Sequence, residues 1–343
     1  MNTHDGEARR FRVALDGSDD SFTVTPPESI LTAARRAGYW LPYECGWGSC
    51  ARCKATVVDG EVEVLFPEAP AITERDISRN RFLMCQSTPT SNVTVKPLGA
   101  MGPAAERPTK DYVGTLTSRR EVGPSIVELT FTLNEPAVFL AGQYAILHID
   151  EDLKRCYSMS NTPGSSEIEF IIKKYDGHPG STRMFELGVG DTLPIELPYG
   201  DMYLRDVDRP VLLIAGGTGI SAILSLARCI VDDETWANRD VHLLYGATSR
   251  EELVCCEELE ELSRGHRTQL HGALVQAPDD WAGYEGFVTT ALTAVLNAEF
   301  AVEQDLLNAE VYLAGPPAMV NAVQESLGEH GIQLDRIHVD SFG

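Results

Sequence analysis

The sequence predicts three consecutive domains: an α+β domain, an antiparallel β-barrel, and an α/β domain with a parallel sheet. Its 343 residues are enough for two or three domains of ordinary size. The strand pattern changes twice along the chain, first to short strands with turns and then to strands that alternate with helices. A stretch rich in Gly, Ala and Pro, residues 99–108, separates the first domain from the second.

The first segment, residues 11–98, mixes alternating strands with one helix. The expected strands are residues 11–15, 22–24 and 53–58, and the expected helix is residues 29–37. A cysteine-rich loop follows the helix, so this part of the chain combines a small α+β fold with a cluster of sulfur ligands.

The second segment, residues 110–206, contains many short strands separated by turns. We expect strands at residues 112–117, 126–133, 144–149 and 168–173. Short strands at regular spacing are typical of a small antiparallel barrel.

The third segment alternates apolar strands with helical stretches. The strands are expected at residues 211–215, 241–245, 270–275 and 311–314, and a helix at residues 221–229 follows the first of them. This alternation predicts a parallel sheet covered by helices.

Charge and composition limit the classes of partner. The formal net charge is −23 and hydrophobic residues make up 43% of the chain, so each domain can bury a core. Such an acidic protein is not expected to bind nucleic acid or anionic lipid non-specifically. A dinucleotide site would need local backbone N–H donors and a few placed cations. The acidic run at residues 257–261 is expected to be a solvated helix face.

The start of the sequence has no apolar signal-peptide region. Residues 211–231 are apolar enough to raise the question of a membrane span, but a strand, a glycine turn and a core helix explain them better. We therefore expect a cytoplasmic protein without membrane contact. Its eight cysteines should then be thiols or metal ligands rather than disulfides.

Four cysteines form the most informative pattern in the sequence. Cys45, Cys50 and Cys53 follow the spacing C-x4-C-x2-C, and Cys85 lies 32 positions further on. This is the plant-type [2Fe-2S] spacing, in which one compact loop supplies three of four thiolates. Small residues fill most of the loop and let backbone N–H groups approach the cluster, whereas Trp47 departs from that pattern.

A zinc site and unrelated buried cysteines are the two other interpretations of this pattern. Zinc sites favour paired C-x2-C knuckles, and the chain has only one such pair. Cys156, Cys229, Cys255 and Cys256 lie in apolar strand or helix contexts, and we expect them to be buried thiols without a ligand role.

The strand Arg155-Cys156-Tyr157-Ser158 suggests a flavin site. Alternate residues of a strand share a face, so Arg155 and Tyr157 point the same way. An arginine binds a pyrophosphate and a tyrosine stacks on a flat ring, whereas Ser158 would hydrogen-bond flavin N5. Alone the motif also fits a surface strand. A turn at residues 177–181, with Ser181 and Thr182 ahead of a helix, predicts a phosphate-binding helix N-terminus.

A glycine turn in the third segment suggests a nucleotide site. Residues 211–215 lead into Gly216-Gly217-Thr218-Gly219, and a helix follows. Strand, glycine turn and helix suit a dinucleotide pyrophosphate, although the run is not a formal G-x-G-x-x-G. Gly315 and Pro316 follow another apolar strand at its carboxyl end, where ligands bind in open α/β sheets.

Together these motifs resemble the reductase components of bacterial multicomponent oxygenases, within the ferredoxin–NADP reductase superfamily. Toluene, alkene and methane monooxygenase reductases and carbazole dioxygenase reductase show the same arrangement. The resemblance covers residues 11–343 and rests on residues 42–53, 80–86, 142–144, 155–158, 198–200, 215–219, 245–246 and 315–317. It implies a plant-type [2Fe-2S] ferredoxin (β-grasp) domain at residues 1–100, an FAD-binding β-barrel domain at 108–206 and an NAD(H)-binding α/β domain at 207–343.

The resemblance also implies roles for single residues. Arg155, Tyr157 and Ser158 would contact FAD, with Ser181 on its phosphates. Residues 216–219 and 315–317 would hold the nicotinamide dinucleotide. Phe342 would cover the flavin face that the nicotinamide must reach, or else anchor the C-terminus in the core.

One position departs from the family pattern, and one short segment bears on the choice between NADH and NADPH. Many relatives have cysteine where this chain has Ala314, which puts the efficiency of hydride transfer in doubt. Carboxylates in residues 250–252 would suit a ribose 2′-hydroxyl and repel a 2′-phosphate, whereas Arg250 would do the opposite. We expect NADH to be preferred.

The function that the resemblance implies is electron transfer from NADH to FAD, to the [2Fe-2S] cluster, and to a terminal oxygenase component acting on a hydrocarbon or aromatic substrate. The cofactors carry the chemistry, so no catalytic side chain beyond them is expected. Trp47, Arg52 and Lys54 are candidate docking residues because they adjoin cluster ligands. Alternatives are a deoxysugar dehydratase as acceptor, a sodium-pumping quinone reductase flavoprotein, whose membrane anchor is lacking, and a non-catalytic ferredoxin-like binding module.

Overall fold

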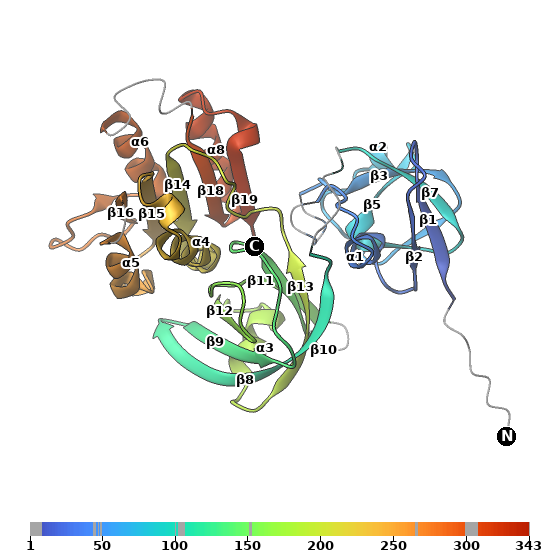
Figure 1. Cartoon of the computed structure of the whole chain (residues 1–343), viewed down its shortest axis with the longest axis horizontal. Helices are drawn as coiled ribbons and strands as arrows, with labels where there is room; N and C mark the ends of the chain where they lie inside the picture. Colours follow the sequence, from blue (N-terminus) through green and yellow to red (C-terminus); the bar gives the residue numbers. More distant parts are fainter. Residues whose placement is uncertain are drawn as a thin grey trace. The chain divides into compact units, whose positions relative to one another are not determined.

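The computed structural model of the chain describes residues 9–43, 46, 48, 50–99, 101, 107–150, 153–264, 267–298 and 308–342. It divides into two compact units, one ending at Lys110 and the other beginning at Asp111. Figure 1 shows the elements of each unit, coloured along the chain.

The first unit is built on a five-stranded mixed sheet. In spatial order its strands are β2 (Ser21–Val24), β1 (Phe11–Leu15), β7 (Val93–Pro97), β3 (Lys54–Asp59) and β5 (Arg81–Leu83). β1 and β7 are parallel, and the other described pairs are antiparallel. Helix α1 (Ile30–Arg36) begins where the sequence predicts, because the Ser29 side chain accepts a hydrogen bond from the Thr32 N–H.

Four short elements complete this unit. They are β4 (Val62–Val64), α2 (Glu74–Ile77), the 3₁₀ turn η1 (Met84–Gln86) and β6 (Ser87–Pro89), and β4 pairs with β6. Thr73 and Asp76 form a capping box at the start of α2. Because η1 follows β5 directly, Cys85 is held at the end of a strand that belongs to the main sheet.

The second unit contains a six-stranded antiparallel sheet. Its spatial order is β11 (Leu153–Ser158), β10 (Tyr144–Asp150), β13 (Thr192–Tyr199), β8 (Lys110–Gly123), β9 (Ile126–Leu133) and β12 (Glu167–Lys173). The two edges meet through an isolated bridge between Met159 and Phe170, so the expected barrel is only partly formed in the described residues. Helix α3 (Pro179–Glu186) packs its Met184 into the core of this sheet.

The same unit contains a six-stranded parallel sheet. Its spatial order is β17 (Tyr284–Glu285), β16 (Arg267–Leu274), β15 (Asp240–Ala247), β14 (Val211–Gly216), β18 (Glu310–Gly315) and β19 (Ile337–Ser341). Helices α4 (Ile220–Asp232) and α5 (Cys256–Ser263) cover one face. Helices α6 (Val288–Ala298) and α8 (Pro317–Glu329) cover the other, as Figure 1 shows.

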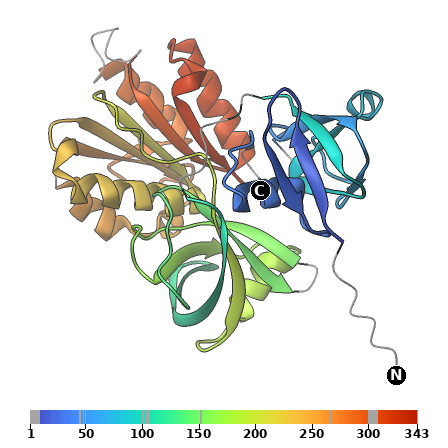
Figure 2. The same ribbon diagram turned by 45° about the vertical axis from the view of Figure 1, so that its right-hand side comes forward.

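The two sheets of the second unit share a hydrophobic core. Ile126 and Ile171 from the antiparallel sheet belong to the same buried cluster as the inward face of α4. Gly142, at φ +91°, allows this close approach, because a Cβ there would stand 3.0 Å from a methyl carbon of Leu226 on α4. Figure 2 shows α4 between the two sheets. The FAD-type and nucleotide-type folds are therefore packed as one body.

The apolar stretch at residues 211–231 forms β14, the 3₁₀ turn η2 (Gly217–Gly219) and most of α4, as predicted. Among the helices that the structure describes, none combines the length and the apolar character needed to cross a membrane.

Candidate functional site

Two of the four predicted cluster ligands lie side by side. The Sγ atoms of Cys53 and Cys85 are 3.1 Å apart, and both residues are buried. They converge because β3 and β5 are antiparallel neighbours, with Lys54 opposite Leu83. Residues 32 positions apart in sequence are thus brought to one end of the strand pair.

The other two predicted ligands lie on the preceding loop. Cys50 is half-buried, and Cys45 lies outside the described residues, as do Ser49 and Trp47. Within the described part of the chain, no three His, Cys, Asp or Glu side chains are grouped so that they would hold a metal ion.

The conformation of the cysteine loop fits a cluster that needs close backbone approach. Gly46 and Gly48 have φ values of +64° and +89°, and Ala51 also has a positive φ of 64°. A Cβ on Gly48 would stand 3.0 Å from Ala69 Cβ, so the position requires glycine. Gln86, beside Cys85, donates its Nε2–H to the Gly46 carbonyl over 3.2 Å. Thiol donors on a small-residue loop held in this way suit an iron–sulfur cluster.

The predicted docking residues have different surroundings. Lys54 is mostly buried and forms a 2.8 Å ion pair with Asp76. Hydrogen bonds from Lys54, and then from Thr73, hold the pKa of the Asp76 carboxyl well below its usual range. Lys54 is therefore used inside the fold, whereas Arg52 is exposed.

In the R-x-Y-S strand, Arg155 lies against the start of α3. A Cβ on Gly180 would stand 2.7 Å from Arg155 Cγ and 2.8 Å from its Nε, so only glycine fits beneath this side chain. No local pattern in the sequence marks Gly180. The turn predicted through Ser181 is shorter in the structure, because α3 already begins at Pro179, a residue that favours the first helical position.

The first turn of α3 presents backbone donors next to this arginine. The Thr182 N–H donates to the His178 carbonyl over 3.2 Å, and the residues before it precede the first intrahelical bond. The Ser181 hydroxyl accepts from the Tyr175 N–H over 3.1 Å. Because that hydroxyl is used locally, an anion at this helix end would meet backbone N–H groups together with the Arg155 guanidinium.

Tyr157 and Ser158 point to opposite sides of β11. Tyr157 lies opposite Ala145 and packs against Phe170 with ring centroids 6.3 Å apart. Burial raises the pKa of its phenol. Ser158 donates its hydroxyl to Asp340 of β19 and accepts from the Ser221 hydroxyl of α4 at its carbonyl, over 2.6 Å. Ser158 thus marks the point where β11, α4 and β19 meet.

The glycine turn lies at the switch point of the parallel sheet. β15 and β16 lie on one side of β14, and β18 and β19 lie on the other. Gly217 has a φ of +54°, and no described atom lies within 4 Å of where its Cβ would stand. A Cβ on Gly216 would overlap the sulfur of Met319, and one on Gly219 would overlap the carbonyl of Ala314. Gly217 therefore leaves open space for a ligand, and the other two glycines serve packing inside the protein.

The remaining predicted nucleotide residues lie beside this turn. Gly315 also packs on Met319, because a Cβ on Gly315 would stand 2.7 Å from the Met319 Cε. Thr218 is half-buried. Pro316 is exposed at the start of α8. The Phe342 N–H donates to the Gly315 carbonyl over 3.3 Å, which places the C-terminal aromatic residue next to the same strand end.

Arg250 has an acidic partner in the structure. Its two terminal nitrogens each lie 3.0 Å from a carboxylate oxygen of Asp280. Glu251 accepts from Ser249 over 2.6 Å, and Glu252 pairs with Lys173 at 2.7 Å. The positive charge of Arg250 is thus balanced before any ligand arrives.

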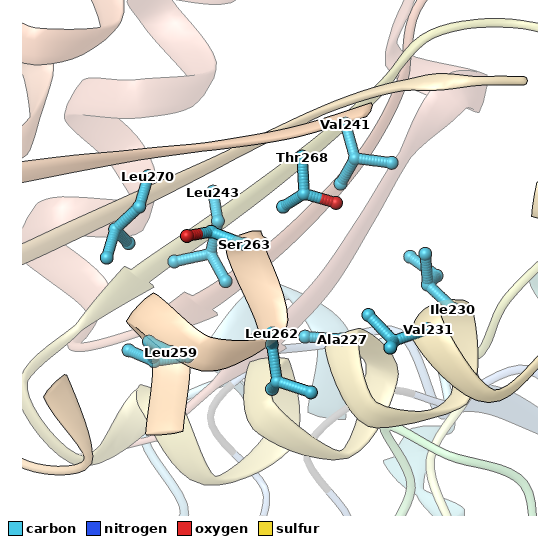
Figure 3. Close-up of a pocket in the computed structure, with 10 residues that line it drawn as sticks. All are labelled: Ala227, Ile230, Val231, Val241, Leu243, Leu259, Leu262, Ser263, Thr268 and Leu270. Carbon is cyan, nitrogen blue, oxygen red and sulfur yellow. The ribbon is translucent and has the colours of Figure 1, made fainter. Parts of the chain in front are cut away.

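A small apolar pocket lies between α4, α5 and the strands β15 and β16 (Figure 3). Ala227 and Ile230 of α4 face Leu259 of α5 across it. Its volume of about 10 Å³ holds one water molecule at most. This pocket is therefore no cofactor site.

The remaining four cysteines, which were expected to be buried thiols, are half-buried. Burial raises the pKa of Cys229 to about 11 and of Cys255 to about 12. Both thiols pack against the core around α4.

A thiol loop, an arginine over a helix N-terminus and a glycine turn at a sheet switch point together define a flavo-iron-sulfur oxidoreductase. Comparisons with known proteins agree. Residues 13–90 match a 2Fe-2S iron-sulfur cluster binding domain, residues 113–203 an oxidoreductase FAD-binding domain, and residues 213–325 an oxidoreductase NAD-binding domain.

Full-length relatives narrow the class. The chain is 33% identical to the reductase component of phenol 2-monooxygenase from Pseudomonas sp. (strain CF600), over 97% of this chain and 96% of the relative. It is 31% identical to the electron transfer component of anthranilate 1,2-dioxygenase from Acinetobacter baylyi (strain ATCC 33305 / BD413 / ADP1), over 95% of both chains. A solved ferredoxin reductase in carbazole 1,9a-dioxygenase superposes with a TM-score of 0.84 at 27% identity, covering 98% of this chain and 99% of that one.

The chain belongs to the family of reductase components of multicomponent mono- and dioxygenases. It is an NADH-dependent oxidoreductase whose three domains bind a [2Fe-2S] cluster, FAD and NAD in that order along the sequence.

Proposed function

We propose that this chain accepts hydride from NADH at FAD and delivers single electrons through its [2Fe-2S] cluster to a terminal oxygenase component. The observation that carries the proposal is the joint presence of the buried Cys53–Cys85 thiol pair and the Ser158 junction in a chain with full-length reductase relatives. The flavin supplies the conversion between two-electron and one-electron chemistry, and the protein supplies binding, orientation and electrostatics.

Cys45, Cys50, Cys53 and Cys85 are the proposed ligands of the cluster. The close approach of Cys53 and Cys85 supports two of these assignments. The positive φ values of Gly46 and Gly48 support the other two, because they suit a backbone that comes close to a cluster.

Arg155 and the first turn of α3 are the proposed FAD phosphate site. A guanidinium next to backbone N–H groups at a helix N-terminus suits a pyrophosphate. Ser181 and Thr182 contribute through that helix turn. Tyr157 and Ser158 are assigned to the isoalloxazine ring, and Phe342 to the side from which the nicotinamide approaches.

Residues 216–219 with Gly315 and Pro316 are the proposed nicotinamide dinucleotide site. The open left-handed position at Gly217 supports this, because a pyrophosphate needs close access to backbone N–H groups. The pairing of Arg250 with Asp280 supports NADH over NADPH, since it removes a cation that would otherwise attract a 2′-phosphate.

The proposed partner is an oxygenase that acts on a hydrocarbon or aromatic substrate. Relatives that serve a monooxygenase and a dioxygenase are about equally similar to the chain, at 33% and 31% identity, so the class of oxygenase stays open. The cluster loop is the proposed docking surface, with Arg52 as its described exposed cation.

A test is NADH-driven reduction of a one-electron acceptor by the flavin- and iron-loaded protein. We expect Arg155→Ala to lose FAD on purification, so that its rate of acceptor reduction falls to background. Arg183→Ala should retain both its FAD and its rate of acceptor reduction. Arg183 is the matched control because it forms an exposed ion pair with Glu186 on the same helix α3. The proposal would be refuted if wild-type protein that holds FAD and iron did not reduce the acceptor with NADH.

A further inference from the structure

Helix α4 has a polar face that contacts the antiparallel sheet of the second unit. Ser221, Ser225 and Arg228 are spaced by four and three residues, which places them on one side of a helix. Ser221 donates to the Ser158 carbonyl and Ser225 to the Asn161 carbonyl, each over 2.6 Å. We call these three residues the α4 polar face.

Arg228 completes this set of contacts. Its Nη1 donates to the Ser160 carbonyl and to Glu169, both over 2.9 Å. The α4 polar face thus binds three carbonyls within four consecutive residues of the chain.

These carbonyls have a special position in the fold. They lie at the end of β11 and just after it, and because Ser160 and Asn161 are buried, at 1% and 8% exposure, their carbonyls need donors. The N–H groups of the same segment bind the antiparallel sheet, from Met159 to the Gln143 carbonyl over 3.2 Å and from Ser160 to the Glu169 carbonyl over 2.9 Å. One side of the segment is therefore fixed to its own sheet and the other side to α4.

Carboxylates hold Arg228 in place. Its Nε and Nη2 bind the two oxygens of Glu258 on α5, at 2.6 and 3.1 Å, opposite the contact with Glu169. Burial alone would lower the pKa of this guanidinium, but the hydrogen bonds that it donates to Glu258 and Glu169 outweigh burial and raise the pKa. Arg228 is thus a permanent cation that joins α4 and α5 to the antiparallel sheet. Glu258 is the half-buried exception in an acidic run that is otherwise mostly exposed.

The same helix adjoins the proposed nucleotide site. α4 starts at Ile220, directly after the turn Gly217–Gly219, and Ser221 lies in its first turn. A rigid helix therefore connects the glycine turn with Ser158, the proposed contact of the flavin ring. Apolar packing by Leu226 resists separation of the two sheets, whereas directional hydrogen bonds also resist sliding.

We propose that Ser221, Ser225 and Arg228 are positioning residues for hydride transfer, which set the distance between the flavin ring at Ser158 and the nicotinamide held by the glycine turn. This inference rests on the proposed function. The three residues touch neither cofactor in the assignment, and they act through the backbone of residues 158–161. A displacement of about 1 Å between reacting groups costs on the order of 100-fold in rate.

The experiment measures flavin reduction by NADH in anaerobic stopped flow on the holoenzyme. The variants are Ser221→Ala, Ser225→Ala, their double variant and Arg228→Lys. Ser263→Ala is the serine control, because the Ser263 hydroxyl on α5 donates to the carbonyl of Glu260, one turn earlier on the same helix, over 2.8 Å. Arg120→Lys is the arginine control, because Arg120 forms a bidentate pair with Glu128 inside one sheet.

The double variant is expected to reduce its flavin about 10-fold more slowly at saturating NADH, with the Kd for NAD⁺ changed less than about 2-fold. Arg228→Lys is likewise expected to reduce its flavin more slowly with a nearly unchanged Kd for NAD⁺. Both control variants are expected to reduce their flavin at the wild-type rate. Rates are taken per flavin-loaded molecule, so that partial loss of FAD does not enter. If the double variant does not fold, the single variants carry the test.

Two results would overturn the inference. In the first, every variant retains the wild-type limiting rate and loses only thermal stability, which is what a merely structural role predicts. In the second, the rate falls only through weaker NAD⁺ binding. Failure of the proposed function is a separate outcome, because wild-type flavin would then not be reduced by NADH at all.

Discussion

At the scale of single residues, we expect Asp280 to weaken the positive potential of Arg250 beside the proposed nucleotide site, because the two form an exposed ion pair. The pair is bidentate, and the bond from Arg250 lowers the pKa of Asp280, so the carboxylate is charged at neutral pH. Asp280→Asn should release Arg250 and raise kcat/KM for NADPH relative to NADH by about 3- to 10-fold. Steady-state kinetics with both nucleotides measure the ratio.

Asp279→Asn is the matched control for this prediction, because it removes the same charge from the neighbouring exposed residue. A ratio that shifts equally in both variants would show that only the general negative potential matters. No shift in Asp280→Asn would separate Arg250 from nucleotide selection.

The raised pKa of Cys229 predicts how its thiol reacts. Burial, and then the charge of Asp232, raise the pKa to about 11 from an ordinary value of 9.0. A raised pKa favours the neutral thiol, so at pH 8 the thiolate fraction falls from about a tenth to about a thousandth. Alkylation by iodoacetamide, followed by peptide mass spectrometry, should be roughly 100-fold slower than in the unfolded chain.

The pH profile of this reaction gives the sharper check. The native alkylation rate should keep rising about tenfold per pH unit beyond pH 9, because the thiolate is still a minor species there. A rate that levels off near pH 9 would mean that the pKa is not raised. Iodoacetamide applied in short pulses limits exposure of the fold to alkali.

At the scale of elements, the contact between the glycine turn and α8 predicts a coupled pair. A Cβ on Gly216 would overlap Met319, so Gly216→Ala should cost about 1–3 kcal/mol and lower Tm by several degrees. Met319→Ala removes the obstructing sulfur. The double variant Gly216→Ala/Met319→Ala should therefore lose less stability than the two single variants lose in sum, which thermal melts of the holoenzyme measure. Strict additivity would contradict the packing role of Gly216.

The elements also show how far the sequence predicts the fold. The strands predicted at residues 211–215 and 241–245 lie within β14 and β15. They were predictable because a nearly continuous apolar run is typical of a buried parallel strand. β19 was not predicted, because the run Ile337–Ser341 is short and has only two apolar residues, and its pairing with β18 is what makes it a strand. β8 is longer than expected because its polar end, through Arg119 and Arg120, is held by the pairing with β9.

The candidate sites remain proposals, and the sequence signals that suggest them are mostly local. Three of the four cysteines, the R-x-Y-S strand and the glycine turn each lie within a few consecutive residues, and Cys85 follows 32 positions later. The contacts of Ser221 with Ser158 and of Ser158 with Asp340 join residues 63 and 182 positions apart, so no local pattern reveals them. The same holds for Gly180, whose need for glycine arises from Arg155 on another element. The expected domain boundaries, residues 1–100, 108–206 and 207–343, stay predictions.

At the scale of the whole molecule, the division at Lys110 and Asp111 predicts that the functions separate. A fragment of residues 111–343 contains both sheets with their shared core, so it should fold, retain FAD and reduce ferricyanide with NADH at a rate within about 3-fold of the full chain. It should lose the reduction of an oxygenase partner, because it lacks the cysteine loop. A fragment that still reduced the partner would remove the cluster from the path.

The central claim is that one chain carries electrons from NADH through flavin to a two-iron cluster, and anaerobic titration with NADH tests it most directly. Optical spectra follow the flavin while EPR follows the cluster. We predict that about one and a half equivalents of NADH per chain bleach the flavin and develop a reduced [2Fe-2S] signal, because the flavin takes two electrons and the cluster one. Bleached flavin without any EPR signal, in protein that holds about two irons per chain, would contradict the claim.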